Sequence, residues 1–336
     1  MKNKKRIIAL LLALALCLPV MLCSCGAKDE NNIAEDKCII KVGSHEVSYG
    51  LYRYFFLNYK DAYTKEELEA DASSIYKKIE EECIKSILGM YAVVDLCAEY
   101  GIKTTDSEIK DQVDATIASI KEQYADELTD KSGEQGYKEQ LKINHMTEEV
   151  FRLVCAVDAC EQTLFMKLTT DGTIPSDDSS VRAAIDSDFI RILQVYINTE
   201  ATNLTYDEAK ALADDICKKA KAGADFNTLV YENSNDYTMT KDGYYMPRGW
   251  MSEEIDEVAF KLSVGEVSDV VELGDGFHIL KRFEMEEEYI EKSLETLKER
   301  YQTCKFYEIV DKRQATLKAD KTDLFYEIDP ALIALD

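Results

Sequence analysis

The feature that most constrains the fold is a change in the spacing of apolar residues near residue 188. Before this point apolar side chains recur every three or four residues, for example at Ile75, Ile79 and Cys83, as on the buried face of a helix. After it, strand-like runs alternate with short helical segments, and the helical spacing returns from Met285. This order predicts an α+β protein in which a small mixed unit is inserted into a mostly helical one.

Turn and capping residues divide the helical part. Gly43-Ser44 separates two short apolar runs and predicts a pair of strands. Thr64 and Glu67 have the spacing of a capping box at the start of a helix, and Thr105 and Glu108 repeat it. Helices are therefore expected over 51–59, from 64 to 101, from 105 onward, over 137–142 and over 148–168.

The mixed unit is expected between residues 187 and 284. In chain order we expect a strand over 189–197, helices over 205–222, 226–231 and 254–260, and strands over 269–272 and 277–283. A single helix after Met285 cannot bury its own apolar stripe, so it is expected to pack with the N-terminal helices. The predicted divisions are a signal peptide at 1–24, a tether at 25–36, a helical domain from 37–186 plus 285–336, and the mixed domain at 187–284.

The N-terminus predicts export and a lipid anchor. Basic residues precede an unbroken apolar run from Ile7 to Leu18, which is shorter than the roughly 20 residues of a membrane-spanning helix and is typical of a signal peptide. The following Leu-Cys-Ser-Cys-Gly resembles a bacterial lipobox, in which the cysteine, here Cys25, is diacylated on sulfur and becomes the new N-terminus. The alternative is an ordinary secretory signal cut near Ser24.

Charge and composition disfavour several classes of function. The 65 acidic against 40 basic side chains give a net charge of −25, which repels a polyphosphate backbone, so no nucleic-acid partner is expected. His45, His145 and His278 lie too far apart to form a local zinc motif, so no metal site is predicted. The seven cysteines beyond Cys25 are odd in number and irregularly spaced, which favours free buried thiols over a disulfide framework.

Several motifs of the mixed unit carry a resemblance. Asn233–Asp236, Gly243–Met251, Gly265–Ser268 and Gly276–Ile279 occur in the order and approximate spacing of parvulin peptidyl-prolyl isomerases, a likeness that covers about 187–284. The flanking helices and the lipobox are similar in layout to PrsA-type foldase lipoproteins and, more distantly, to SurA.

This resemblance implies a function. It implies an isomerase that rotates Xaa-Pro bonds in unfolded exported polypeptides, needs no cofactor, and is held by its lipid on the outer face of a Gram-positive cell membrane. A homodimer is left open. The alternative is a non-catalytic holdase chaperone with a degenerate parvulin domain. A solute-binding lipoprotein fits less well, because it would show alternating strands and helices throughout.

The resemblance also implies a proline-binding pocket. Met251 and Ile255 stand where parvulins place the Met and Phe that contact the proline ring. Tyr245 and Met246 would form a further wall, with Phe260 beneath it. The alternative is that these side chains belong to the core.

Three polar residues are the catalytic candidates that the resemblance implies. Asp236 stands where parvulins have Cys or Asp, and His278 matches the second family histidine. Gln194 stands where the first histidine is expected, so the usual histidine pair is broken, and Leu273 replaces a hydroxyl partner of the pair. The alternatives are a solvated loop carboxylate for Asp236 and a buried structural role for His278.

Overall fold

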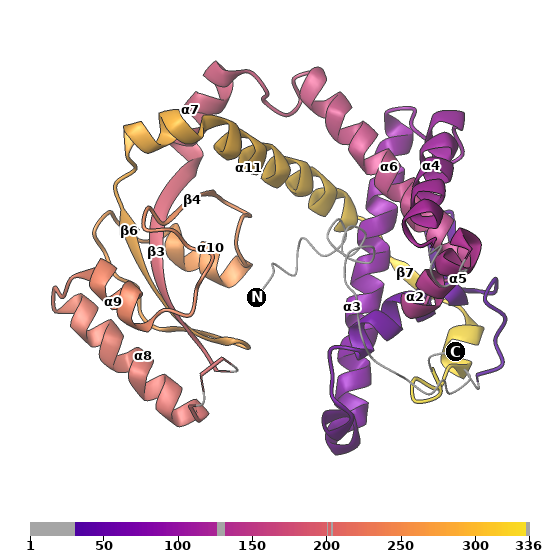
Figure 1. The fold of residues 1–336 in the computed structure, drawn as a ribbon, viewed down its shortest axis with the longest axis horizontal. Helices are drawn as coiled ribbons and strands as arrows, with labels where there is room; N and C mark the ends of the chain where they lie inside the picture. Colours follow the sequence, from indigo (N-terminus) through magenta and orange to yellow (C-terminus); the bar gives the residue numbers. More distant parts are fainter. Residues whose placement is uncertain (1–30, 126–131, 200, 203, 334–336) are drawn as a thin grey trace. The chain divides into compact units, whose positions relative to one another are not determined.

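The computed structural model describes residues 31–125, 132–199, 201–202 and 204–333. Contacts divide the described chain into two compact units (Figure 1). We call residues 31–167 together with 309–333 the helical unit, and residues 168–308 the mixed unit. The predicted signal peptide and the proposed lipidation residue Cys25 lie outside the described residues.

The helical unit begins with two strands and continues as helices. β1 (Cys38–Val42) and β2 (His45–Ser48) are antiparallel and turn at Gly43, whose φ of 57° is a conformation that glycine adopts without strain. The helices that follow are α2 (Tyr49–Lys60), α3 (Lys65–Glu99), α4 (Ser107–Gln123), α5 (Gly133–Ile143) and α6 (Glu148–Thr170).

The predicted start and buried face of α3 are confirmed. The Thr64 hydroxyl accepts a hydrogen bond from the Glu67 backbone at 3.2 Å, and the Glu67 carboxylate accepts one from the Thr64 backbone at 2.7 Å. Ile75, Ile79 and Cys83 are buried. Capping and packing therefore agree in fixing this helix.

Two parts of the helical unit differ from prediction. α4 starts at Ser107, after Asp106, rather than after the predicted cap at Thr105. The chain after Met285 was expected to stay helical to its end, but it leaves the helix after Gln314 and forms β7 (Ala319–Lys321) and a 3₁₀ turn, η2 (Asp323–Glu327). β7 pairs with β1 in a sheet ordered β2-β1-β7, a partner 280 residues away that no local pattern reveals.

The mixed unit is built on an antiparallel sheet ordered β4-β3-β6-β5. Its strands are β3 (Phe189–Asn198), β4 (Tyr244–Pro247), β5 (Val271–Leu273) and β6 (Gly276–Phe283). Its helices are α7 (Asp178–Asp188), α8 (Tyr206–Lys221), α9 (Phe226–Asn233), α10 (Glu253–Ala259) and most of α11 (Glu287–Gln314). α7 and β4 were not predicted. α7 lies in a stretch of turn-forming residues, where Asp177 caps it by accepting a hydrogen bond from the Ser180 backbone at 2.9 Å.

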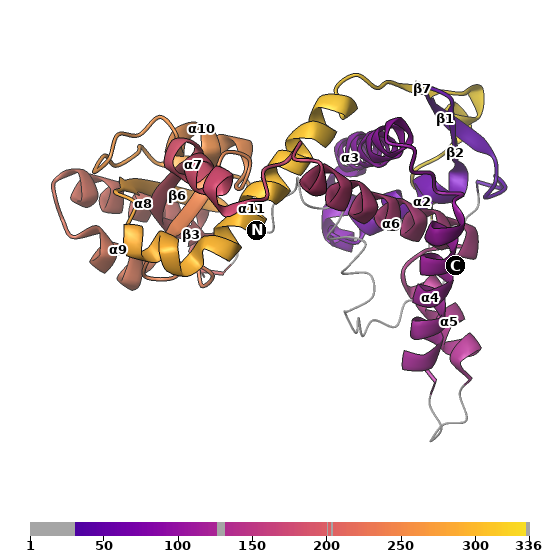
Figure 2. The ribbon, with the colours of Figure 1, turned by 90° about the horizontal axis from the view of Figure 1, so that it is seen from above.

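Different helices cover the two faces of this sheet, with α9 and α10 on opposite sides of β3 and β6 (Figure 2). On one face Leu193, Val195 and Ile197 pack with β6 and with α8 and α9. The other face carries what we call the α10 cluster, whose buried members are Ile190, Ile192, Met246, Ile255, Ala259, Leu262 and Leu280. The first face serves as an ordinary core, and the second also carries polar side chains.

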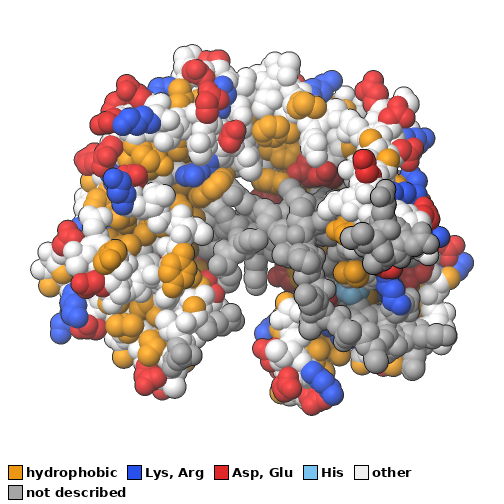
Figure 3. Space-filling model, in the orientation of Figure 1, with side chains coloured by type: hydrophobic (Ala, Val, Ile, Leu, Met, Phe, Trp, Pro, Cys, Tyr) orange, Lys and Arg blue, Asp and Glu red, His pale blue; other side chains and the backbone are white. Residues whose placement is uncertain are grey.

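The described surface carries side chains of both charges. On the face shown in Figure 3, acidic side chains are interspersed with basic ones. Within the described ranges, no helix combines the length and the hydropathy that crossing a membrane requires.

Candidate functional site

Gln194 links the three polar candidates into one hydrogen-bonded chain. Its side-chain nitrogen Nε2 donates to Asp236 Oδ2 at 2.5 Å, and its oxygen Oε1 lies 3.2 Å from His278 Nδ1. β3 and β6 place Tyr196 directly opposite His278, and Gln194, two residues before Tyr196, points to the same face. Gln194 and His278 are both buried. The structure therefore brings together all three residues that the sequence suggested for catalysis.

Asp236 lies in the loop after α9 and is held by several donors. Its Oδ1 accepts from the Thr238 hydroxyl at 2.8 Å and from the Thr238 backbone at 3.1 Å, and its Oδ2 accepts from the Tyr244 hydroxyl at 2.8 Å. Burial raises the pKa of Asp236, but the hydrogen bonds from Gln194, Thr238 and Tyr244 outweigh it and leave the pKa below its ordinary value. Asp236 is therefore an ionised carboxylate at neutral pH.

Tyr196 and Asp275 are two further neighbours of the His278 ring. The Tyr196 ring stacks on the imidazole with the ring centres 4.5 Å apart, and its hydroxyl donates to Asp275 Oδ2 at 2.9 Å. Asp275 Oδ1 lies 3.6 Å from His278 Nε2. Burial raises the pKa of Asp275, but its interactions with His278 and Tyr196 outweigh it and lower the pKa overall.

The α10 cluster lies on the same face of the sheet as this polar chain. Met246 and Ile255 are buried in it, while Met251 and Phe260 pack against it and remain partly exposed. The guanidinium of Arg248 lies 4.2 Å from the centre of the Phe260 ring. Four of the five residues predicted to contact proline therefore gather at one apolar surface.

Comparison with known proteins decides the family of this unit. The family model described as Rotamase, PPIC-type PPIASE domain, matches residues 193–284. The mixed unit contains a parvulin domain. The match includes Gln194, Asp236, His278 and the α10 cluster residues of β4 and α10.

Curated relatives extend the likeness beyond the parvulin domain. The foldase protein PrsA of Bacillus subtilis is 39% identical over 83 residues, which are 24% of this chain and 28% of that protein. PrsA 2 of Bacillus anthracis is 26% identical over 63% of this chain and 66% of its own length. PrsA of Caldanaerobacter subterraneus is 25% identical over 82% of each chain. The chain thus spans less than two thirds of the first two relatives and resembles PrsA foldases over most of its own length.

Solved structures with similar chains include other PrsA proteins. The crystal structure of PrsA from Streptococcus pneumoniae is 23% identical, covers 72% of this chain and 87% of that chain, and gives a TM-score of 0.33. PrsA from Bacillus anthracis is 19% identical over 68% of this chain and 94% of that chain, with a TM-score of 0.35. Both scores are low, so the family of the parvulin domain rests on the sequence matches.

The structure separates Tyr245 from the other predicted pocket residues. Its ring stacks on Tyr289 with the centres 4.1 Å apart, and its hydroxyl accepts a hydrogen bond from the Glu286 backbone at 3.1 Å. It belongs to a different cluster, formed with residues of α7 and α11. Successive side chains of a strand point to opposite faces, so Tyr244 and Met246 share one face of β4 while Tyr245 lies on the other.

Sequence reasoning therefore missed three polar members of the site. They are Tyr196 and Asp275, which contact His278, and Tyr244, which contacts Asp236. The two-residue period of strands carried the signal for the tyrosines, since Tyr196 follows Gln194 and Tyr244 precedes Met246 by two positions. Asp275 precedes β6 in a tight turn, and its contact depends on that turn.

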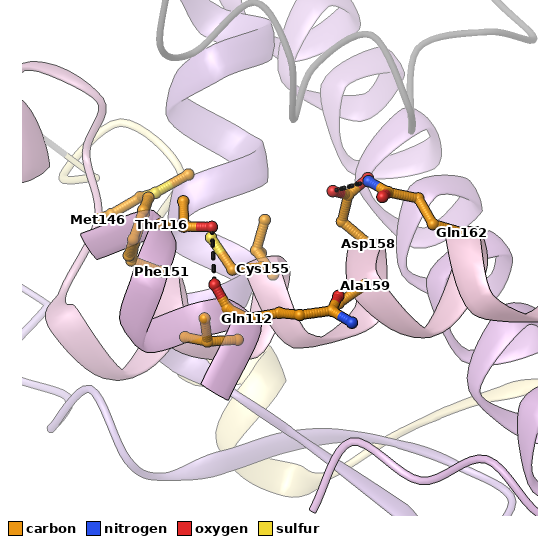
Figure 4. A pocket seen from close by; sticks show the side chains of 10 residues that line it. Gln112, Thr116, Met146, Phe151, Cys155, Asp158, Ala159 and Gln162 are labelled. Atoms are coloured by element: carbon orange, nitrogen blue, oxygen red, sulfur yellow. Dashed lines mark hydrogen bonds between the residues drawn. The ribbon is translucent and has the colours of Figure 1, made fainter. Parts of the chain in front are cut away.

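A separate hollow lies in the helical unit, between α4 and α6 (Figure 4). Its volume is about 130 Å³, and its lining is Gln112, Val113, Thr116, Met146, Phe151, Val154, Cys155, Asp158, Ala159 and Gln162. None of the predicted site residues lines it. Among the described residues, no group of three or more His, Cys, Asp and Glu side chains is placed to hold a metal ion.

Proposed function

We propose that this protein is an extracytoplasmic foldase whose parvulin domain isomerises Xaa-Pro bonds in exported polypeptides. One observation supports this proposal above the others. One face of the sheet carries two groups of side chains. They are the hydrogen-bonded Asp236, Gln194 and His278, and the partly exposed Met251 and Phe260. We propose 187–284 as the catalytic domain and 37–186 plus 285–336 as the chaperone domain. By their contacts, 168–186 and 285–308 of that chaperone domain lie in the mixed unit.

The chemistry requires no covalent step. Rotation about a peptide bond has a barrier of about 18–20 kcal/mol because the C–N bond has partial double-bond character. An apolar surface that binds the proline ring removes water from the amide and favours the twisted state, in which that character is lost. In this proposal Met251, Ile255 and Phe260 bind the ring, and Asp236 supplies a fixed negative charge beside the rotating bond.

A protease-coupled assay with an Xaa-Pro peptide tests this function on the protein without residues 1–25. We expect a rate above that of buffer, and we expect the same peptide to shift the NMR signals of Met251, Ile255 and His278. The exposed Tyr231 of α9 serves as a control signal that should not move. A peptide that leaves all three site signals unchanged would refute the assignment.

A second candidate is a holdase chaperone that binds unfolded chains without catalysis. Two observations favour it: Gln194 stands in place of a family histidine, and the apolar Leu273 packs against the α10 cluster where a hydroxyl was expected. In this case proline isomerisation would proceed at the buffer rate while aggregation of an unfolded client is still suppressed. The same protein sample measured in both assays separates the two candidates.

The proposed anchor is a lipid on Cys25, with the mature chain on the outer face of the cell membrane. Metabolic labelling with a fatty acid tests it in cells that express the whole chain. We expect labelled protein in the membrane fraction, and loss of both label and membrane association for Cys25→Ala. Secretion of an unlabelled wild-type chain would instead support an ordinary signal cut near Ser24.

A further inference from the structure

Two buried polar atoms of the proposed site, one from Asp275 and one from His278, face each other. Asp275 Oδ1 and His278 Nε2 are 3.6 Å apart, and neither has a hydrogen-bond partner among the described residues. The side chains of His278 and Asp275 are only 8% and 11% exposed, so water does not freely satisfy these atoms. A buried polar atom without a partner is costly, so this pair calls for a physical explanation.

The hydrogen bonds of Gln194 fix where one proton of His278 lies. An ionised Asp236 only accepts, so the Gln194 atom at 2.5 Å from it is the amide nitrogen. The amide oxygen then faces His278 Nδ1 at 3.2 Å. That oxygen also only accepts, so Nδ1 carries a hydrogen and donates it.

A neutral His278 would then place a lone pair on Nε2, because a neutral imidazole carries only one N–H. This lone pair would face the carboxylate of Asp275, which also only accepts. The hydroxyl of Tyr196 cannot relieve the conflict, since it donates to the other carboxylate oxygen, Oδ2. One additional proton on Nε2 would turn two opposed acceptors into an ion pair of the imidazolium with the carboxylate, 3.6 Å apart.

We infer that His278 carries a proton on both ring nitrogens, with Nε2–H paired with the carboxylate of Asp275, and that Asp275 is a positioning residue that keeps His278 a charged donor to Gln194. The consequence is a single direction of donation, from His278 through Gln194 to Asp236. The orientation of Asp236 then depends on Asp275 through this set of hydrogen bonds. The importance of this chain for catalysis rests on the proposed isomerase function, but the position of the proton does not.

The other groups around the imidazole are consistent with this arrangement. The titratable neighbours are Tyr196 from β3, Tyr244 from β4, Asp236 from the loop after α9, and Asp275 from the turn before β6. Burial raises the pKa of Tyr244, so this hydroxyl stays neutral and donates to Asp236. Burial raises the pKa of Asp275, but its interactions with His278 and Tyr196 lower it overall, as expected of a carboxylate that faces a positive group.

Nitrogen-15 NMR of the histidine rings tests the inference in the protein without residues 1–25. Only three histidines contribute signals, and His45→Gln and His145→Gln assign the third by elimination. At pH 7.5, where a free imidazole is mostly neutral, we expect both ring nitrogens of His278 to show the shifts of N–H groups. A neutral Nδ1–H pattern in the wild-type protein would overturn the inference without the need for any variant.

A variant and a matched control sharpen the result. In Asp275→Asn the new amide can donate to Nε2, so the imidazole should become neutral and its Nε2 signal should move to the range of an unprotonated nitrogen. Glu232→Gln makes the same change of charge at an exposed position of α9 and should leave the signals of His278 unchanged. If Asp275→Asn leaves the imidazole protonated, Asp275 is not the residue that holds the proton.

Kinetics then separate this inference from the proposed function. If the protein is an isomerase, Asp275→Asn should lower kcat, because a neutral imidazole is a weaker donor to Gln194 than a charged one. KM for a proline peptide should stay nearly constant, because Met251 and Phe260 are untouched. A larger change in KM than in kcat would contradict the positioning role. If the wild-type protein has no activity but shows the protonated imidazole, the proposed function fails and the charged imidazole stands.

Discussion

The two faces of β3 differ in what each contributes to the protein. Leu193, Val195 and Ile197 point to one face and pack in an apolar cluster with residues of α8 and α9. Gln194 and Tyr196 alternate with them and point to the face that carries the polar chain. Because one strand carries both sets, a substitution at one position should affect folding, and a substitution at the next should affect the site.

The largest expected effect is on the face under α8 and α9. Ile279 of β6 is fully buried there. Ile279→Ala removes buried methyl groups and leaves a cavity, so the free energy of unfolding should fall by about 2–5 kcal/mol. Thermal unfolding measures this loss. Activity per folded molecule should be preserved, and a selective loss of activity would contradict the division of roles.

Asp236→Asn should have the largest effect on the other face. It replaces a carboxylate that accepts hydrogen bonds from Gln194, Thr238 and Tyr244. A hydrogen bond to a charged group contributes about 1.5–3 kcal/mol, so kcat/KM for a proline peptide should fall roughly 10- to 150-fold. Glu232→Gln is the control for the change of charge. If Asp236→Asn keeps full activity, this carboxylate is not part of the site.

Tyr244→Phe and Tyr245→Phe test the alternation within β4. Tyr244→Phe removes the hydroxyl that donates to Asp236 and should lower kcat/KM by about 1 kcal/mol, or roughly fivefold. Tyr245→Phe removes a hydroxyl that bonds the Glu286 backbone on the other face, so it should lower thermal stability slightly and leave kcat/KM unchanged. Equal effects of the two variants on activity would mean that the faces are not functionally distinct.

Met251→Ala should have a smaller effect, confined to substrate binding. Met251 is partly exposed beside the α10 cluster, so its truncation removes part of the surface proposed to bind proline. At about 25 cal/mol per Å² we expect a loss of roughly 0.5–1 kcal/mol, seen as a higher KM. Met246→Ala is the matched control: Met246 is fully buried, so this change should lower the melting temperature instead. An unchanged KM for Met251→Ala would place Met251 in the core.

The smallest expected effect is a dependence of stability on pH. The pKa of Asp236 is lowered in the folded protein, so the unfolded chain binds protons more readily. Its contribution is therefore present above the ordinary carboxylate pKa of about 3.9 and is lost as the pH falls below that value. The gap in urea midpoint between wild type and Asp236→Asn should be constant near neutral pH and narrow below about pH 4. A gap that widens in acid would have the wrong sign.

Local patterns were sufficient for most of the elements. The capping box at Thr64 and Glu67 and the stripe at Ile75, Ile79 and Cys83 depend on residues within one or two turns, and both occur as predicted. The grouping of Gln194, Asp236 and His278 came instead from the order of the parvulin motifs. The helix was predicted from short-range spacing, and the site from the order of whole motifs.

The missed features depend on partners far away in the chain. β4 is only four residues long and pairs with β3 more than 50 positions earlier, so its register was not evident. The prediction that Tyr245 and Met246 both form the pocket wall does not allow for this register, which puts the two neighbouring side chains in different clusters. The contact between Asp275 and His278 likewise depends on the turn that precedes β6. Tertiary pairing, and not local preference, decides these positions.

The pairing of β1 with β7 bears on the order in which the parts of the chain can fold. The helical unit cannot close its three-stranded sheet until Ala319–Lys321 has emerged, since that last strand lies beyond the whole parvulin domain. The parvulin domain has all of its strands between residues 189 and 283 and can fold earlier. When the chain is synthesised from its N-terminus, its middle domain can therefore fold before the sheet that contains its first strand is complete.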